Sequence, residues 1–147
     1  MNRFWWMAIV VGVLVGCAGR GPVVDHSEIY MKHASDPVPR VRYERIRGWQ
    51  PVGREMVMMD FGARGQYLFE LSRECHSRLH TTLTLHLDNY QPRVIDITDR
   101  IIIDEVHRCR IMNMWPVDLR AVRDELATRD EGVIERGVET AHPDDDH

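Results

Sequence analysis

Side chains that could bind a metal ion or act as nucleophiles lie in two short stretches. They are Cys75, His76, His80 and His86, followed by His107 and Cys109. Zinc and copper accept thiolate and imidazole ligands, and a thiolate beside a histidine can act as a nucleophile. The spacing matches no standard metal motif, and only imidazoles remain as ligands if the two cysteines are oxidised. Surface histidines are the favoured interpretation, and copper or zinc binding through His76, His80 or His107 is the alternative.

The sequence contains no common catalytic motif. C-x-x-C, G-x-S-x-G and H-E-x-x-H are all absent. Asp60, Glu70 and Asp99 could supply a carboxylate pair for hydrolysis, but nothing in the sequence places two of them together. We therefore predict a protein that is not an enzyme, with no catalytic residue, no metal site and no cofactor.

The third cysteine, Cys17, ends a short apolar N-terminal segment. Arg3 precedes a stretch from residue 4 to 15 that has no charged side chain and is shorter than the roughly 20 residues needed to span a bilayer. The run Leu14-Val15-Gly16-Cys17 resembles the lipobox of bacterial lipoproteins. This resemblance implies that residues 1–16 are a signal peptide, that the Cys17 thiol carries a diacylglycerol and that the new amine is acylated by a fatty acid such as palmitate. Residues 17–24 are then a tether.

Lipidation of Cys17 leaves Cys75 and Cys109 as one pair in an oxidising compartment. A disulfide between them would close a loop of about 35 residues and stabilise the domain by roughly 3.5–4 kcal/mol. Ala18 stands where the lipoprotein sorting rule expects an aspartate for retention at the inner membrane. By resemblance to that rule, we expect the protein on the periplasmic face of the outer membrane.

Length and charge limit the other function classes. Removing residues 1–16 leaves about 130 residues, enough for one domain with a modest core. The net charge is −4 at pH 7, and the sequence has no obvious basic stripe. Because nucleic-acid binding needs clustered Lys or Arg, we expect no nucleic-acid partner.

The helices flank a strand-rich middle. Asp25 and Glu28 have the form of a capping box, which predicts a helix through Ala34. Asp118 is a predicted N-cap for a second helix, which Gly132 and Gly137 should break. Residues 129–147 are expected to be an acidic, disordered tail.

Runs of about five to seven residues between turn signals predict the strands. Two of them flank a Gly62–Gly65 loop that suits a hairpin. In residues 80–87, alternation predicts Leu83 and Leu85 on the core face. Residues 93–103 are either one straight strand or two strands with a bend near Asp99, the favoured interpretation. The expected strands are 41–47, 55–61, 66–71, 80–87, 93–103 and 108–114, the last ended by Trp115-Pro116.

These elements predict a single α+β domain over residues 25–128. Its antiparallel β-sheet has five or six strands and could curl into a partial barrel. One short N-terminal helix precedes the sheet, and one C-terminal helix follows it.

The order of short motifs along the mature chain resembles that of a known family. They are Gly48-Trp49, Tyr67-Leu68 with Leu71, Cys75, Leu79, Asp99, Cys109-x-Ile111 and Pro116-Val117-Asp118. With the lipobox, they are similar to a family of small lipoproteins of Gram-negative bacteria that has a domain of unknown function. The resemblance implies an antiparallel β-rich domain with a cysteine pair at Cys75 and Cys109. It does not assign an activity.

The functional expectation follows from the anchor and the missing catalytic motifs. We expect a lipid-anchored periplasmic or envelope protein that acts as a non-enzymatic binding or structural module. Its partners would be the membrane, through the N-terminal lipid, and an envelope protein that the sequence does not identify.

Overall fold

The computed structural model describes residues 24–139, and for residues 131–139 it describes the backbone alone. The predicted signal peptide, Cys17 and all of the tether except Val24 lie outside these residues. Within the described part of the chain, no helix has both the length and the apolar character needed to cross a membrane.

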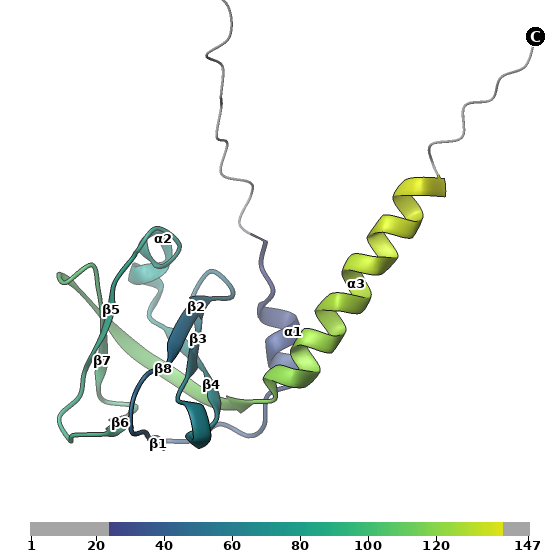
Figure 1. The fold of residues 1–147 in the computed structure, drawn as a ribbon. Helices are drawn as coiled ribbons and strands as arrows, with labels where there is room; N and C mark the ends of the chain where they lie inside the picture. Colours follow the sequence, from purple (N-terminus) through teal and green to yellow (C-terminus); the bar gives the residue numbers. More distant parts are fainter. Residues whose placement is uncertain (1–23, 140–147) are drawn as a thin grey trace, which may run out of the picture.

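A curled antiparallel sheet of six strands forms the centre of the domain (Figure 1). In spatial order its strands are β2 (Gly48–Pro51), β3 (Met56–Asp60), β4 (Gln66–Leu71), β8 (His107–Val117), β7 (Arg100–Ile103) and β5 (Leu85–Asp88). The long strand β8 pairs with β7 through its first half and with β4 through its second half. A separate two-stranded sheet is formed by β1 (Arg40–Arg42) and β6 (Val94–Asp96). The predicted α+β class and curled antiparallel sheet are confirmed.

The predicted hairpin between β3 and β4 is present. Its loop contains a short 3₁₀ helix, η1 (Gly62–Arg64), and the two glycines have φ values of +66° and +97°. A side chain is disfavoured in this left-handed region, which is why the loop carries glycine at Gly62 and Gly65.

The bend favoured near Asp99 is confirmed, since β6 ends at Asp96 and β7 begins at Arg100. The carboxylate of Asp99, which is 8% exposed, accepts hydrogen bonds from the backbone N–H groups of Tyr90 (3.1 Å) and Asp96 (2.8 Å). The backbone donors thus compensate the cost of burying this carboxylate, and the carboxylate in turn holds the turn between β6 and β7.

The strand predicted over residues 80–87 is wrong in its first half. Helix α2 (His76–Leu79) comes first, and the chain becomes a strand only at Leu85. Thr82 is buried here, and its hydroxyl donates to the Thr84 carbonyl, whereas Leu83 is 92% exposed. The carbonyl of Arg78 accepts the N–H groups of residues 81 and 82, so a helical turn replaces the alternating strand.

The strand predicted over residues 41–47 is much shorter than expected. Only β1 (Arg40–Arg42) forms, and the following residues cross from one sheet to the other. The N–H of Tyr43 donates to the Arg93 carbonyl, and the N–H of Arg47 donates to the Asp60 carbonyl. The backbone N–H groups of this crossing segment bond to two different parts of the fold, so the segment does not extend β1 as a single strand.

The prediction that Trp115-Pro116 ends the last strand is also wrong. Strand β8 runs to Val117, and Pro116 pairs in register with Tyr67. On the other side of β8, the N–H of Ser35 donates to the Pro116 carbonyl (2.9 Å). The ladder needs a carbonyl here rather than a donor, so a proline is tolerated.

Helix α1 (Ser27–Lys32) has its N-cap at His26, one residue later than expected, and ends two residues before Ala34, and the predicted capping box is wrong. Asp25 instead accepts the backbone N–H and the hydroxyl of Ser27. The N-cap predicted at Asp118 is confirmed, because its Oδ1 accepts the N–H groups of Arg120 (3.0 Å) and Ala121 (3.2 Å).

Helix α3 (Leu119–Glu139) continues through both glycines that were expected to break it. A glycine inside a helix costs about 1 kcal/mol relative to alanine but keeps its N–H donor, so the hydrogen-bond ladder is not interrupted. The break predicted at these glycines is therefore wrong, and residues 140–147 of the predicted tail lie outside the described residues.

Both faces of the sheet are covered by buried side chains. Met59 and Phe69 belong to a core cluster inside the curl, whereas Met58 and Leu68 belong to a second cluster with residues of α1 and α3. Neighbouring positions on β3 and β4 therefore pack into different clusters, as expected for strands whose side chains alternate between faces.

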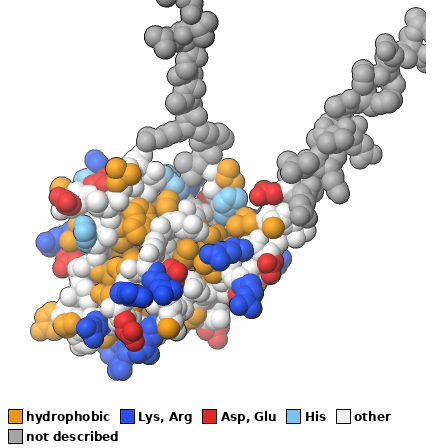
Figure 2. All heavy atoms as spheres, viewed as in Figure 1, with side chains coloured by type: hydrophobic (Ala, Val, Ile, Leu, Met, Phe, Trp, Pro, Cys, Tyr) orange, Lys and Arg blue, Asp and Glu red, His pale blue; other side chains and the backbone are white. Residues whose placement is uncertain are grey.

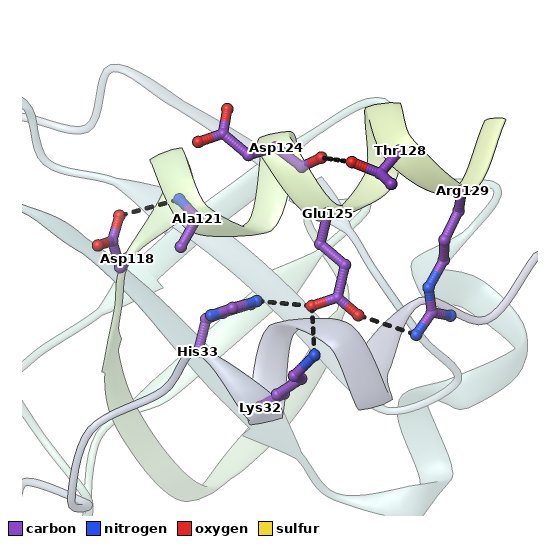
Figure 3. Close-up of polar contacts among 8 residues, drawn as sticks. All are labelled: Lys32, His33, Asp118, Ala121, Asp124, Glu125, Thr128 and Arg129. Carbon is purple, nitrogen blue, oxygen red and sulfur yellow. Dashed lines mark hydrogen bonds and ion pairs between the residues drawn. The ribbon is translucent and has the colours of Figure 1, made fainter. Parts of the chain in front are cut away.

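Glu125 joins α1 to α3 (Figure 3). Its carboxylate accepts hydrogen bonds from Lys32 Nζ (2.8 Å) and Arg129 (2.9 Å), and it lies 2.8 Å from His33 Nε2. Hydrogen bonds from Lys32 and His33 hold the pKa of Glu125 at about 2, below its ordinary value of 4.5. The carboxylate is therefore strongly favoured in its charged form.

We expect Glu125→Gln to make unfolding less dependent on pH in the acid range. A depressed folded-state pKa contributes stability above the unfolded-state value of 4.5, and this contribution is lost as the pH falls from there to about 2. Urea unfolding between pH 5 and 2 should give a shallower decline for this variant than for the wild type. Glu28→Gln is the control, since Glu28 makes no side-chain hydrogen bond within residues 24–130. Equal slopes for wild type and Glu125→Gln would contradict this account.

Candidate functional site

The predicted cysteine pair is a disulfide in the structure. The bond between Cys75 and Cys109 joins the 3₁₀ helix η2 (Arg73–Cys75) to β8. Both residues are buried, with exposed fractions of 3% and 0%. Neither sulfur is available as a metal ligand or nucleophile while the bond is intact.

Two of the candidate histidines line the same cavity. His76 and His80 lie on and just after α2, around a cavity of about 550 Å³ that is also lined by Asp25, Arg54, Ser77 and Thr81. His80 Nε2 lies 2.8 Å from the carbonyl oxygen of Gly53. Because a carbonyl can only accept, Nε2 carries the proton, and only Nδ1 of His80 is left as a ligand atom.

The other two histidines do not line this cavity. His86 is exposed on β5, and His107 begins β8. Among the described residues, no group of three His, Cys, Asp or Glu side chains is close enough to hold a metal ion. The metal-binding alternative gains no support from the geometry and stays a prediction.

The three candidate carboxylates have separate structural partners. Asp60 accepts the N–H of Gly62 (2.7 Å), Glu70 accepts the Asn113 amide (2.6 Å), and Asp99 holds its turn. Glu70 is paired with Met56, four residues before Asp60 on β3, which separates their backbones by about 13 Å along the strand. Asp60 and Glu70 are therefore too far apart to act as one carboxylate pair.

A group of arginines forms a site that the sequence analysis missed. Arg42, Arg64 and Arg93 line a cavity of about 430 Å³, together with Tyr43, Glu44, Pro92 and Val94. We call these seven residues the arginine pocket. The three arginines come from three segments: the end of β1, the loop helix η1 and the residue before β6.

Backbone contacts hold the three segments of the arginine pocket together. Arg42 pairs in register with Val94, and the next hydrogen bond runs from the Tyr43 N–H to the Arg93 carbonyl (3.0 Å). The Arg47 N–H donates to the Asp60 carbonyl (2.8 Å), which brings the crossing segment to the η1 loop. These contacts fix the positions from which the arginine side chains extend.

The charge of the arginine pocket is only partly balanced. Arg64 pairs with Glu44 (3.2 Å), but no carboxylate of the described residues lies within 4.0 Å of the Arg42 or Arg93 guanidinium. Figure 2 shows basic side chains gathered at the lower end of the domain, where Figure 1 places β1 and β6. The signal was present in the sequence, as arginines at positions 40, 42, 45 and 47.

Comparisons with known proteins assign the chain to a family without assigning an activity. No curated protein and no solved structure matches it. Residues 1–132 match the model of a family of unknown function (DUF6491), and the chain therefore belongs to that family.

Proposed function

We propose that this chain is a lipid-anchored envelope protein that works as a non-enzymatic binding or structural module. The observation that carries the proposal is the Cys75–Cys109 disulfide. Disulfides form and persist in oxidising compartments such as the periplasm and are rare in the cytosol. A domain whose core contains this bond is suited to the cell envelope.

The remaining cysteine supports the anchor. Of the three cysteines in the chain, only Cys17 lies outside the disulfide, and it ends the apolar segment with the lipobox pattern. The region matched by the family begins at residue 1 and so includes this segment. We place the lipid on Cys17 and, from Ala18, the protein on the periplasmic face of the outer membrane.

The described side chains support binding rather than catalysis. Cys75 and Cys109 are bonded to each other, and the three candidate carboxylates serve turns and strand contacts. The arginine pocket, by contrast, contains Arg42 and Arg93, whose guanidinium groups are not paired with any carboxylate among the described side chains. A module that presents such groups in one concave site is equipped to hold an anionic partner.

Metabolic labelling with an alkynyl palmitate analogue tests the anchor. We expect the wild type to be labelled and to fractionate with outer membranes, because acylation of Cys17 retains it there. Cys17→Ser should abolish the label, whereas a Cys75→Ala/Cys109→Ala variant should keep it. A wild-type protein that is unlabelled and found in the cytosol would refute the proposal.

Crosslinking in intact cells tests the binding role. One dominant crosslinked envelope protein is expected for a module with a specific partner. Recovery of random neighbours alone, in proportion to their abundance, would count against a specific protein partner.

A further inference from the structure

We propose that the arginine pocket binds a phosphomonoester group, carried either by a soluble molecule or by a lipid headgroup. The proposal rests on Arg42, Arg64 and Arg93 and does not depend on the N-terminal anchor. Its failure would leave the proposed envelope location untouched, and failure of the anchor would leave the pocket untouched.

The first step of the argument is convergence. Three guanidinium side chains, from segments far apart in the sequence, line one concave site of about 430 Å³. Arg42 and Arg93 lie beside each other at the end of the β1–β6 ladder, and Arg64 reaches the site from the β3–β4 hairpin. Like charges that line one site repel one another, and a bound anion relieves that repulsion.

The second step is the charge balance. The arginine pocket contains three arginines and one carboxylate, Glu44, which pairs with Arg64 at 3.2 Å. Arg40, which lies outside the arginine pocket, forms an ion pair with Asp96 at 2.9 Å, so its charge is already balanced. The uncompensated charge at Arg42 and Arg93 matches a phosphomonoester, whose charge is about −1.5 to −2 at pH 7.

The third step is the chemistry of the donors. The guanidinium group is planar and permanently charged, and its N–H groups form a fork that fits phosphate oxygens in pairs. Tyr43 adds a half-buried ring to the lining. The forks of Arg42 and Arg93, with the Arg64 N–H groups that Glu44 does not accept, can satisfy the oxygens of a terminal phosphate, which a diester bridge would present less completely.

The conformation of Arg93 is consistent with a role for its side chain. Arg93 has a φ of +61°, in the left-handed region that favours glycine or asparagine. The turn is held by Asn89, whose Nδ2 donates to the carbonyls of Gln91 (2.6 Å) and Val94 (3.1 Å). A non-glycine residue held in this conformation by its surroundings is a candidate functional residue.

The pocket lies away from the point where the described chain begins. Figure 1 shows the chain entering α1 from above, whereas β1 and β6 lie at the lower end of the domain. The β1–β6 end of the arginine pocket therefore lies at the opposite end of the domain from the start of the described chain. Both a soluble phosphomonoester and the headgroups of a facing membrane could reach it.

The test is a titration of the whole chain, purified in a non-ionic detergent, with glycerol 3-phosphate. Binding is followed by calorimetry and by the NMR signals of the arginine Nε–H groups. We expect saturable binding with shifts at Arg42, Arg64 and Arg93. Succinate, a dicarboxylate of the same charge, should bind more weakly.

Paired variants assign the binding to this pocket. Loss of a charge-assisted hydrogen bond weakens binding by roughly tenfold, so Arg42→Ala/Arg93→Ala should weaken it by about tenfold or more. Arg78→Ala/Arg120→Ala removes the same charge from exposed positions outside the pocket and should leave the affinity unchanged. Glu44→Gln releases Arg64 and should tighten binding. Thermal melts of each variant confirm that it is folded.

A second titration distinguishes the two sources of the phosphate. Short-chain phosphatidic acid in the same detergent presents the group on a lipid, and phosphatidylcholine is its control. Binding of glycerol 3-phosphate identifies a soluble ligand, and binding of phosphatidic acid alone identifies a headgroup; either supports the proposal. The proposal would be overturned if neither glycerol 3-phosphate nor phosphatidic acid bound, or if the Arg42→Ala/Arg93→Ala variant bound with the affinity of the wild type. It would also be overturned if succinate bound equally well, or if an oligonucleotide without a terminal phosphate bound more tightly.

Discussion

A Cys75→Ala/Cys109→Ala variant should lose about 3.5–4 kcal/mol of unfolding free energy. The disulfide joins residues 34 positions apart, and removing it restores the entropy of that open loop to the unfolded chain. A domain of this size has only about 5–15 kcal/mol of stability in total, so the loss is a large part of it. Urea unfolding monitored by circular dichroism measures the change.

A reducing agent provides the matched control for the disulfide prediction. Dithiothreitol should lower the stability of the wild type towards that of the double variant and should leave the variant unaffected. A double variant as stable as the wild type would contradict the stabilising role. So would a reductant effect of the same size on both proteins.

Leu79→Ala and Leu83→Ala should differ sharply although the two leucines are close in sequence. Leu79 is 1% exposed within the core cluster, and truncating such a leucine costs about 2–5 kcal/mol. Leu83 is 92% exposed, and its truncation should change stability by no more than about 0.5 kcal/mol. Chemical denaturation of both variants measures the difference.

The same pair tests the course of the chain from α2 to β5. If residues 80–87 formed a continuous strand with Leu83 facing the core, Leu83→Ala would be as costly as Leu79→Ala. Comparable losses for the two variants would therefore contradict the helical turn that the structure places before Leu85.

Features governed by local chemistry could be predicted from the sequence. Gly62 and Gly65 marked the β3–β4 loop because their backbone conformations require glycine. Asp99 marked a bend because a carboxylate among isoleucines would be costly unless a turn supplied donors. The helix start at Asp118 was equally local, since a cap needs only the next few backbone N–H groups.

Features governed by contacts between distant segments could not be predicted in the same way. The alternation around Leu83 fits a strand, but Thr82 and Thr84 on either side of it both contact Asp104, in the turn between β7 and β8. The continuation of β8 through Pro116 depends on Ser35, which approaches from the far end of the chain. Neither partner is visible in the local pattern.

The arginine pocket shows the same difficulty in the candidate site. Arg42, Arg64 and Arg93 are separated by more than twenty residues at each step, and only the fold brings them around one cavity. The net charge of −4 gave no indication of these arginines, because the net charge of a whole chain does not show where positive side chains cluster. A local count over residues 40–47 would have indicated a basic segment.

The intact mass of the protein purified from membranes tests the central claim most directly. If Cys17 is the anchor in an oxidising compartment, the mass should equal that of residues 17–147 with a diacylglyceryl group and one fatty acyl group each in place of a hydrogen, less two hydrogens for the Cys75–Cys109 bond. A mass corresponding to the unprocessed chain with free thiols would contradict the account.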